Sequence, residues 1–195
     1  MTSIHPTQVL MNEHRVIERV LAAMETKVAE LGSGPFPRRF FDQAVDFFAN
    51  FADRCHHGKE EQRLFPLLKE RGIPEEGGPI GVMLHEHDEG RAYLAALRDN
   101  LDDAERGEPE AVAVVRAAAT DYIELLRHHI QKEDNILFAM ARRVLSPEDV
   151  ERLQKEFQCV EEHHIGPGVH AHYEALAAEL SGTGVAHPCC VPSLP

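Results

Sequence analysis

Two short segments of the chain repeat each other, and each carries a histidine four residues before a glutamate. The first pairs His56 with Glu60, the second pairs His129 with Glu133, and Leu-Phe follows each pair. Residues four apart on a helix lie on the same face, so each pair would present an imidazole and a carboxylate together. Nitrogen and oxygen ligands of this kind suit a transition metal such as iron. Two copies therefore predict two metal ions, or one dinuclear centre between two helices.

The first segment offers a second register, in which His57 pairs with Glu61. On a helical wheel of about 100° per residue, His56 lies about 80° from the core-facing Phe48, whereas His57 lies about 180° away and would face solvent. We therefore predict that His56 and Glu60 are the ligands, with His57 and Glu61 as the alternative.

Two further histidines, His14 and His87, fall on the apolar seams of helical segments, as do His129 and Glu133. Any single one could be a core histidine that a neighbour satisfies. Burying a polar group without a partner costs about 1–3 kcal/mol, and more for a charge. Six such groups in one bundle are hard to satisfy without cations between them, so the seams favour a metal centre over a purely structural polar core.

The elements that must position these residues are helices separated by Gly/Pro turns. Apolar spacings of three and four predict four long helices, and Ser146-Pro147-Glu148-Asp149 predicts a capped fifth helix that Gly166-Pro167-Gly168 interrupts. The long helices are expected at about residues 5–31, 37–70, 79–106 and 109–145, with Pro66 expected to kink or end the second. No segment alternates with a period of two. We predict an all-α fold, an up-down-up-down four-helix bundle with an additional C-terminal helical segment.

The expected domain organisation is a bundle over residues 1–145, a C-terminal helical segment over 146–180 packing on it, and a disordered tail over 181–195.

The chain has 195 residues, of which 43% are hydrophobic and 27% charged, as in a globular protein. Its net charge of −13 argues against nucleic acid and anionic membranes as partners. No apolar run reaches a membrane span and the first residues lack a signal peptide. Four cysteines without framework spacing favour a reducing cytoplasm. The oligomeric state stays open.

The order of the candidate ligand residues along the chain resembles that of the hemerythrin-like (HHE) domain, over about residues 5–145. The likeness rests on Asn12-Glu13-His14, on Lys59 through Pro66, on Glu86-His87-Asp88-Glu89, and on His129 through Phe138. The resemblance implies two non-haem irons bridged by Glu60 and Glu133 and by oxo or hydroxo groups, and capped by His14, His56, His87 and His129. Met83 and Arg91 stand where oxygen-carrying hemerythrins have a second histidine near His87. The core is more similar to bacterial proteins that repair iron centres under nitrosative stress.

A cluster of acids and histidines surrounds the Gly-Pro-Gly break, and it has two interpretations. It could be a solvated surface patch, or the segment could fold over one end of the bundle so that His170 fills a coordination position, with Tyr173 packed nearby. The cluster comprises Glu161, Glu162, His163, His164, His170 and His172.

The function expected from these residues is binding of, or reaction with, oxygen, nitric oxide or peroxide at a His/Glu-ligated di-iron site. The protein would supply ligands, acceptors for the outer imidazole nitrogens such as Glu13, Glu86 and Asp88, and a dry pocket. That pocket would be lined by Phe48, Met83 and Tyr122. The alternatives are a non-catalytic oxygen or nitric oxide sensor, an iron store or donor, and a zinc or manganese bundle.

Overall fold

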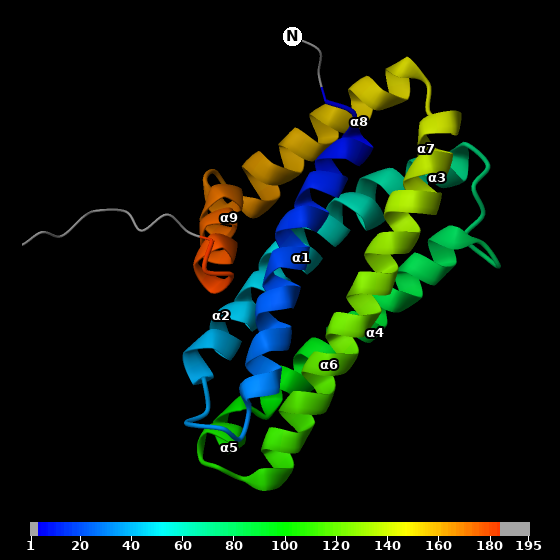
Figure 1. Ribbon diagram of the computed structural model, residues 1–195. Helices are drawn as coiled ribbons and strands as arrows, with labels where there is room; N and C mark the ends of the chain where they lie inside the picture. The colour runs from blue at the N-terminus through cyan, green and yellow to red at the C-terminus, as the bar shows by residue number, and fades with distance from the viewer. Residues whose placement is uncertain (1–3, 184–195) are drawn as a thin grey trace, which may run out of the picture.

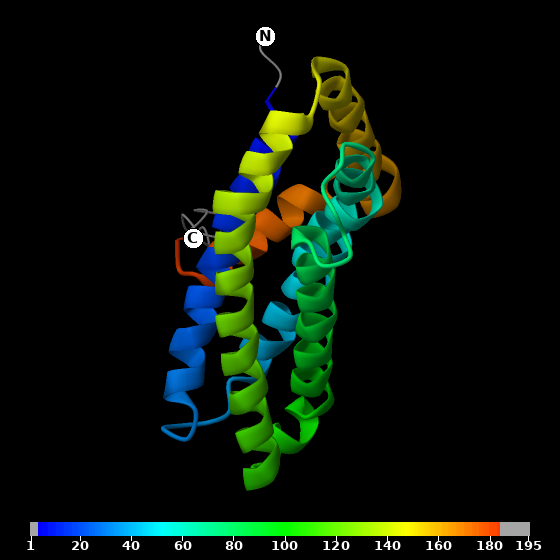
Figure 2. The ribbon, with the colours of Figure 1, turned by 90° about the vertical axis from the view of Figure 1, so that its right-hand side faces the viewer.

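Four long helical rods lie side by side in the computed structural model, which describes residues 4–183 (Figures 1 and 2). The predicted all-α fold is confirmed, and the described residues contain no strand. In chain order the rods are α1 (Pro6–Glu30); α2 (Arg38–Phe47) with η1 (Phe48–His57), η2 (Glu60–Leu64) and α3 (Phe65–Glu70); α4 (Pro79–Asp99) with α5 (Leu101–Glu105); and α6 (Pro109–Lys132) with η3 (Glu133–Leu137) and α7 (Phe138–Val144).

Each rod begins and ends where its local sequence dictates. A proline occupies the first turn of α1, α4 and α6, where its missing N–H costs no hydrogen bond. Gly32, Gly72 and Gly107 follow the rods with positive φ values of 85° to 88°, a conformation that glycine adopts without steric cost. Pro66 does not end the second rod, because α3 continues to Glu70.

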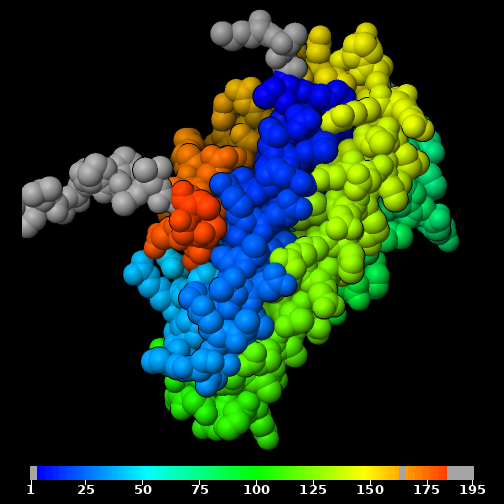
Figure 3. Space-filling view, in the orientation of Figure 1, coloured from blue at the N-terminus to red at the C-terminus, as the bar shows by residue number. Residues whose placement is uncertain are grey.

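The C-terminal segment consists of α8 (Pro147–Cys159), η4 (Val160–Ile165) and α9 (Val169–Leu180). The predicted capping box is present: the Ser146 hydroxyl accepts from the Asp149 amide, and the Asp149 carboxylate accepts from the Ser146 amide. Helix α8 packs on α1 and η2, and α9 packs on α1 and α2 (Figure 1). Figure 3 shows the C-terminal helices directly beside α1 on the surface. The expected disordered tail lies largely outside the described residues.

The second and fourth rods widen into π-helical turns near the middle of the bundle. Amides there reach back five residues: Gly58 donates to the carbonyl of Asp53, Phe65 to that of Glu60, and Phe138 to that of Glu133. Such turns contain an extra residue and commonly accompany functional sites. The widening falls on the two repeated segments, and it changes which side chains face inward.

The apolar core is divided into two clusters with a polar layer between them. Along α1, Leu10 belongs to one cluster and Ile17 to the other, and the buried His14 lies between. The fourth rod repeats the order, with Leu126 in one cluster, Leu137 in the other, and Glu133 between. The bundle therefore holds its polar groups in an enclosed layer flanked by apolar packing. Among residues 4–183, no helix combines the length and apolar character that a membrane span requires.

Candidate metal centre

Two groups of buried ligand atoms lie within the polar layer. In each group the ligand atoms lie within 4.8 Å of one another. One group contains His14, His56, Glu60 and Glu133, and the other contains His57, Glu60, His87 and His129. The structure thus brings together the six residues that the repeats and seams singled out, and Glu60 belongs to both groups. That geometry suits a pair of neighbouring cations with a shared carboxylate.

The Nε2 atoms of the histidines converge on the carboxylates. The His14 and His56 Nε2 atoms lie 3.0 Å apart, and the His87 and His129 Nε2 atoms lie 3.2 Å apart. From Nε2 to the nearest Glu133 oxygen, the distance is 3.1 Å for His14 and 3.4 Å for His129. The bundle gathers these ligand atoms around one small volume, from all four rods.

The two central carboxylates lack the partners that buried charges need. Both oxygens of Glu60 and of Glu133 are fully buried and make no hydrogen bond with any residue that the structure describes, and the same holds for His57 Nε2. Leaving such groups unsatisfied is costly, more so for a charge. Burial and the adjacent Glu133 raise the pKa of Glu60 well above its usual value. Divalent cations would satisfy all five atoms, and an imidazole–carboxylate set without thiolate fits iron.

Carboxylates also hold the outer nitrogen of each histidine. With Nδ1–H donating to a carboxylate, Nε2 keeps its lone pair for a metal ion, as in the carboxylate–histidine–metal arrangement. The Nδ1–oxygen distances are 2.7 Å for His14–Asp134, 2.9 Å for His56–Glu13, 2.7 Å for His87–Glu61, 3.0 Å for His129–Glu86 and 3.4 Å for His57–Asp53.

The outer acceptors match the sequence-based expectation only in part. Glu13 and Glu86 contact histidines as expected, but Asp88 is 77% exposed and pairs with Arg91 at 3.0 Å. Glu61 and Asp134 were missed as acceptors. Each directly follows one of the central glutamates, and this shared position in the two repeats was a signal that could have identified them.

The prediction that His57 faces solvent is wrong. His57 is 5% exposed, and its ring stacks on that of His87. The wheel assumed an α-helix, whereas residues 48–57 form the π-helix η1. At about 80° per residue, the nine steps from Phe48 to His57 make about two full turns, which returns His57 to the core-facing side. His56 remains inside as well, so both histidines of this segment enter the layer while Glu61 serves His87.

The structure places His170 beside the outer acceptor Glu13 and not among the central ligand atoms. His170 belongs to neither central group; its Nδ1 lies 3.9 Å from a Glu13 oxygen, and its side chain is 28% exposed. Helix α9 packs on α1 and α2, and His57 already supplies the fifth imidazole. Tyr173 is buried against Phe47, with ring centroids 6.3 Å apart. The side chains of His163 and His164 lie outside the described part of the structure.

Glu13, Cys55 and His170 form a third group of potential ligands, again within 4.8 Å of one another. Glu13 is already occupied, because it accepts from the Lys59 ammonium and from His56. Burial raises the pKa of the Cys55 thiol to about 12, so the thiolate that a metal ion needs is absent at neutral pH. A positive charge and a protonated thiol make this group a poor cation site.

The histidines differ in their readiness to carry a proton. Burial lowers the pKa of His56 to about 4 and that of His57 well below its usual value. Burial also opposes protonation of His129, but Glu133 and Glu86 outweigh it and raise the pKa of His129 to about 9. Without cations, the layer therefore holds part of its compensating charge as protons on imidazoles.

Aromatic rings cover the layer on one side. Phe138 stacks on His14 with centroids 5.6 Å apart, and Phe65 stacks on His87 at 6.0 Å. These are the phenylalanines of the repeated Leu-Phe. Of the pocket lining expected from the sequence, Phe48 and Tyr122 pack against each other at 4.9 Å in one apolar cluster, and Met83 lies in the other.

Comparisons with known proteins agree with this geometry. Residues 5–141 match the family model of the hemerythrin HHE cation binding domain. The chain is 30% identical over 139 residues to the iron-sulfur cluster repair protein DnrN of Neisseria gonorrhoeae, covering 69% of this chain and 86% of that protein. It is 37% identical over 89 residues to the iron-sulfur cluster repair protein YtfE of Escherichia coli O157:H7, covering 44% of this chain and 40% of that protein. The family model spans well over half of the sequence, and the chain belongs to the hemerythrin HHE cation binding domain family.

Proposed function

We propose that this chain is a non-haem di-iron protein that binds or reacts with a small molecule, either a diatomic gas or peroxide. One observation carries the proposal: two buried groups of histidine and glutamate ligand atoms share Glu60, and the oxygens of Glu60 and Glu133 have no hydrogen-bond partner among residues 4–183. Bound cations would stabilise a buried layer of histidines and glutamates far more than hydrogen bonds to other side chains would.

In this proposal each residue has a role that follows from its contacts. Glu60 would be shared by the two ions, and Glu133, whose carboxylate lies near both His14 and His129, would be the second central carboxylate. His14 and His56 would hold one ion, and His57, His87 and His129 would hold the other, in line with the two groups of ligand atoms. The outer carboxylates fix each imidazole so that its Nε2 faces inward. His170 is left out of the ligand set.

Bound iron would supply reversible one-electron exchange between ferrous and ferric states. The protein's own contribution is to hold ligands, exclude bulk water and fix protons. Phe65 and Phe138 shield His87 and His14, and every proposed ligand is at most 5% exposed. The reducing cytoplasm that the cysteine pattern favours would suit ferrous loading.

Metal analysis of protein from iron-supplied cells tests the proposal. We expect about two irons per chain and near-ultraviolet absorption bands in the ferric protein. A colourless protein that holds zinc in the same stoichiometry would contradict the iron assignment, and a protein that holds no metal would contradict the centre itself.

DnrN and YtfE are named iron-sulfur cluster repair proteins, and a second candidate function compatible with that name is the supply of iron from the proposed centre. The match to DnrN extends over 86% of that protein, whereas YtfE is covered over only 40% of its length. A donor should transfer iron to an apo iron-sulfur protein. A catalyst should instead consume nitric oxide or peroxide over many turnovers while keeping its iron. Measuring both on one iron-loaded preparation distinguishes the two.

A further inference from the structure

The two halves of the metal centre contain equivalent lysines. Lys59 and Lys132 each lie three residues after a histidine and one residue before a central glutamate. Each ammonium donates to the glutamate that holds that histidine: Lys59 to Glu13, which contacts His56, and Lys132 to Glu86, which contacts His129. The structure therefore has two similar Lys–Glu–His chains leading to the proposed ions.

These two chains differ in their exposure to water. Lys59 is completely buried, whereas the side chain of Lys132 is 35% exposed. Lys132 lines an open hollow of about 600 Å³ together with Glu86, His128 and Ile136. Water can therefore solvate the Lys132 ammonium and can reach the outer end of the His129 chain.

The C-terminal segment is what buries Lys59. From η4, Glu161 accepts from the Lys59 ammonium at 2.6 Å, and the ring of Phe157 in α8 lies 5.9 Å from the same nitrogen. From α9, His170 reaches to within 3.9 Å of the Glu13 carboxylate that Lys59 contacts. This segment lies beyond residues 5–141, which match the family model.

A buried ammonium is stable only when carboxylates compensate it, and here there are two, Glu13 and Glu161. Removing the charge of Glu161 would leave Glu13 as the one anionic partner of Lys59 within residues 4–183. The ammonium would then draw the Glu13 carboxylate more strongly, at the expense of the Glu13–His56 hydrogen bond. Outer partners of this kind govern how firmly a histidine ligand is held.

We propose that Lys59 is a positioning residue through which the C-terminal segment, residues 147–180, sets how firmly His56 is held toward the metal centre. The link runs from Glu161 through Lys59 and Glu13 to His56. The inference rests on the proposed di-iron centre, and it assigns to the segment a function beyond covering the bundle.

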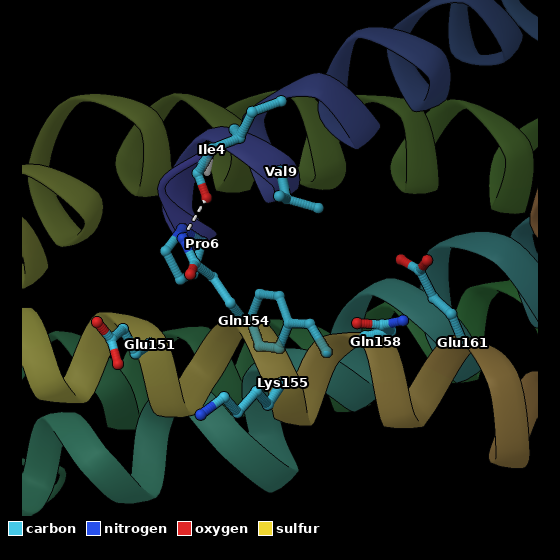
Figure 4. A pocket seen from close by; sticks show the side chains of 9 residues that line it. Ile4, Pro6, Val9, Glu151, Gln154, Lys155, Gln158 and Glu161 are labelled. Carbon is cyan, nitrogen blue, oxygen red and sulfur yellow. Dashed lines mark hydrogen bonds between the residues drawn. The ribbon is translucent and has the colours of Figure 1, made fainter. Parts of the chain in front are cut away.

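The outer end of this link is accessible for a conservative substitution. A hollow of about 500 Å³ lies between the start of α1 and α8, with Glu161 at its edge (Figure 4). The Glu161 side chain is 35% exposed, so a substitution there should disturb the packing little. Glu161→Gln keeps the size of the side chain and removes only its charge. Glu162, the next residue, is exposed and accepts from Gln158, and Glu162→Gln is the matched control.

The test compares the iron-loaded wild-type protein with these two variants. A ferrous chelator is added, and the release of each ion is followed by absorbance. Loss of an outer partner typically weakens metal binding about 10- to 100-fold. We expect Glu161→Gln to release one of the two ions at least roughly tenfold faster, and Glu162→Gln to behave like the wild type. Lys132→Met should accelerate iron release less, because water already solvates the Lys132–Glu86–His129 link.

A second measurement on the metal-free protein separates positioning from stability. Nitrogen-15 NMR reports the Nδ1–H of His56, assigned by its loss in His56→Gln. In Glu161→Gln this signal should shift or exchange faster with solvent, with an unchanged melting temperature. Equal release and equal His56 signals in Glu161→Gln and Glu162→Gln would overturn the inference alone. A wild-type chain that holds no metal would overturn the proposed function as well, so the two failures are distinguishable.

Discussion

The rings of His57 and His87 stack with centroids 3.8 Å apart and an angle of 14° between their planes. His57 comes from η1 and His87 from α4, so the contact joins two rods across the polar layer. It places a fifth imidazole beside the group that contains His129, and makes the two proposed ion positions unequal.

Replacing His57 by alanine should lower the iron content from about two toward one per chain, because the His87–His129 group loses an imidazole. His128 provides a matched control: it also adjoins a histidine, His129, but its side chain is exposed. His128→Ala should keep the wild-type iron content, as measured by metal analysis. Equal iron in His57→Ala and the wild type would remove His57 from the ligand set.

Replacing Glu60 or Glu133 by glutamine should affect both ions, because Glu60 belongs to both groups and Glu133 lies near the Nε2 atoms of His14 and His129. We expect less than one iron per chain. The metal-free Glu60→Gln variant should also unfold at a higher temperature than the metal-free wild type, because a buried carboxyl with a raised pKa is replaced by a neutral amide. Glu124→Gln, at an exposed position of α6, is the control. A full iron content in both central variants would argue against bridging.

The stability of the metal-free protein should fall as the pH rises from about 6.5 to 9. In the folded state Glu133 and Glu86 raise the pKa of His129 to about 9, from the ordinary histidine value of 6.5. A histidine whose pKa is raised by folding stabilises the fold fully at pH values below its pKa in the unfolded chain. This stabilisation is lost as the pH rises through its pKa in the folded protein. The lowered pKa values of His56 and His57 make the fold more stable as the pH rises, but this effect is confined to pH values below about 6.5.

The expected loss across this window is on the order of 1–3 kcal/mol in the free energy of unfolding. Urea titrations at several pH values, with chelator present, measure it. Bound metal replaces the proton on Nε2, so the iron-loaded protein should show a flatter profile. The variant His129→Gln should also flatten the metal-free profile. A metal-free stability that stays constant or rises between pH 6.5 and 9 would contradict the assignment.

Replacing Ser146 by alanine should destabilise α8 by about 0.5–2 kcal/mol, because the amide of Asp149 loses its cap. Asp149 is also held by Arg71, so the start of the helix should fray without leaving the bundle. Hydrogen exchange of the first α8 amides would measure the effect. Ser33→Ala, in the exposed turn after α1, should leave these amides unchanged.

Much of the architecture could be predicted from the sequence because its causes are local. Apolar residues spaced by three and four define the helices, and proline and glycine mark their ends. The same periodicity placed His14, His87, His129 and Glu133 on inward faces, where the structure has them. The Ser146 capping box could be predicted equally well, since it involves residues only three apart in the sequence.

What the local pattern could not determine was the number of residues per turn. An α-helical wheel directs His57 outward, and only the π-helical turns of the folded rod bring it beside His87. The outer partners depend on tertiary packing as well. Asp134 meets His14 across 120 residues of sequence, and Glu161 meets Lys59 across 102, because the rods and α8–η4 pack side by side. The sequence determined that His14, His87, His129 and Glu133 lie on inward faces. The packing of the rods decided which further residues enter the layer and which atoms meet there, since these contacts join residues far apart in the chain.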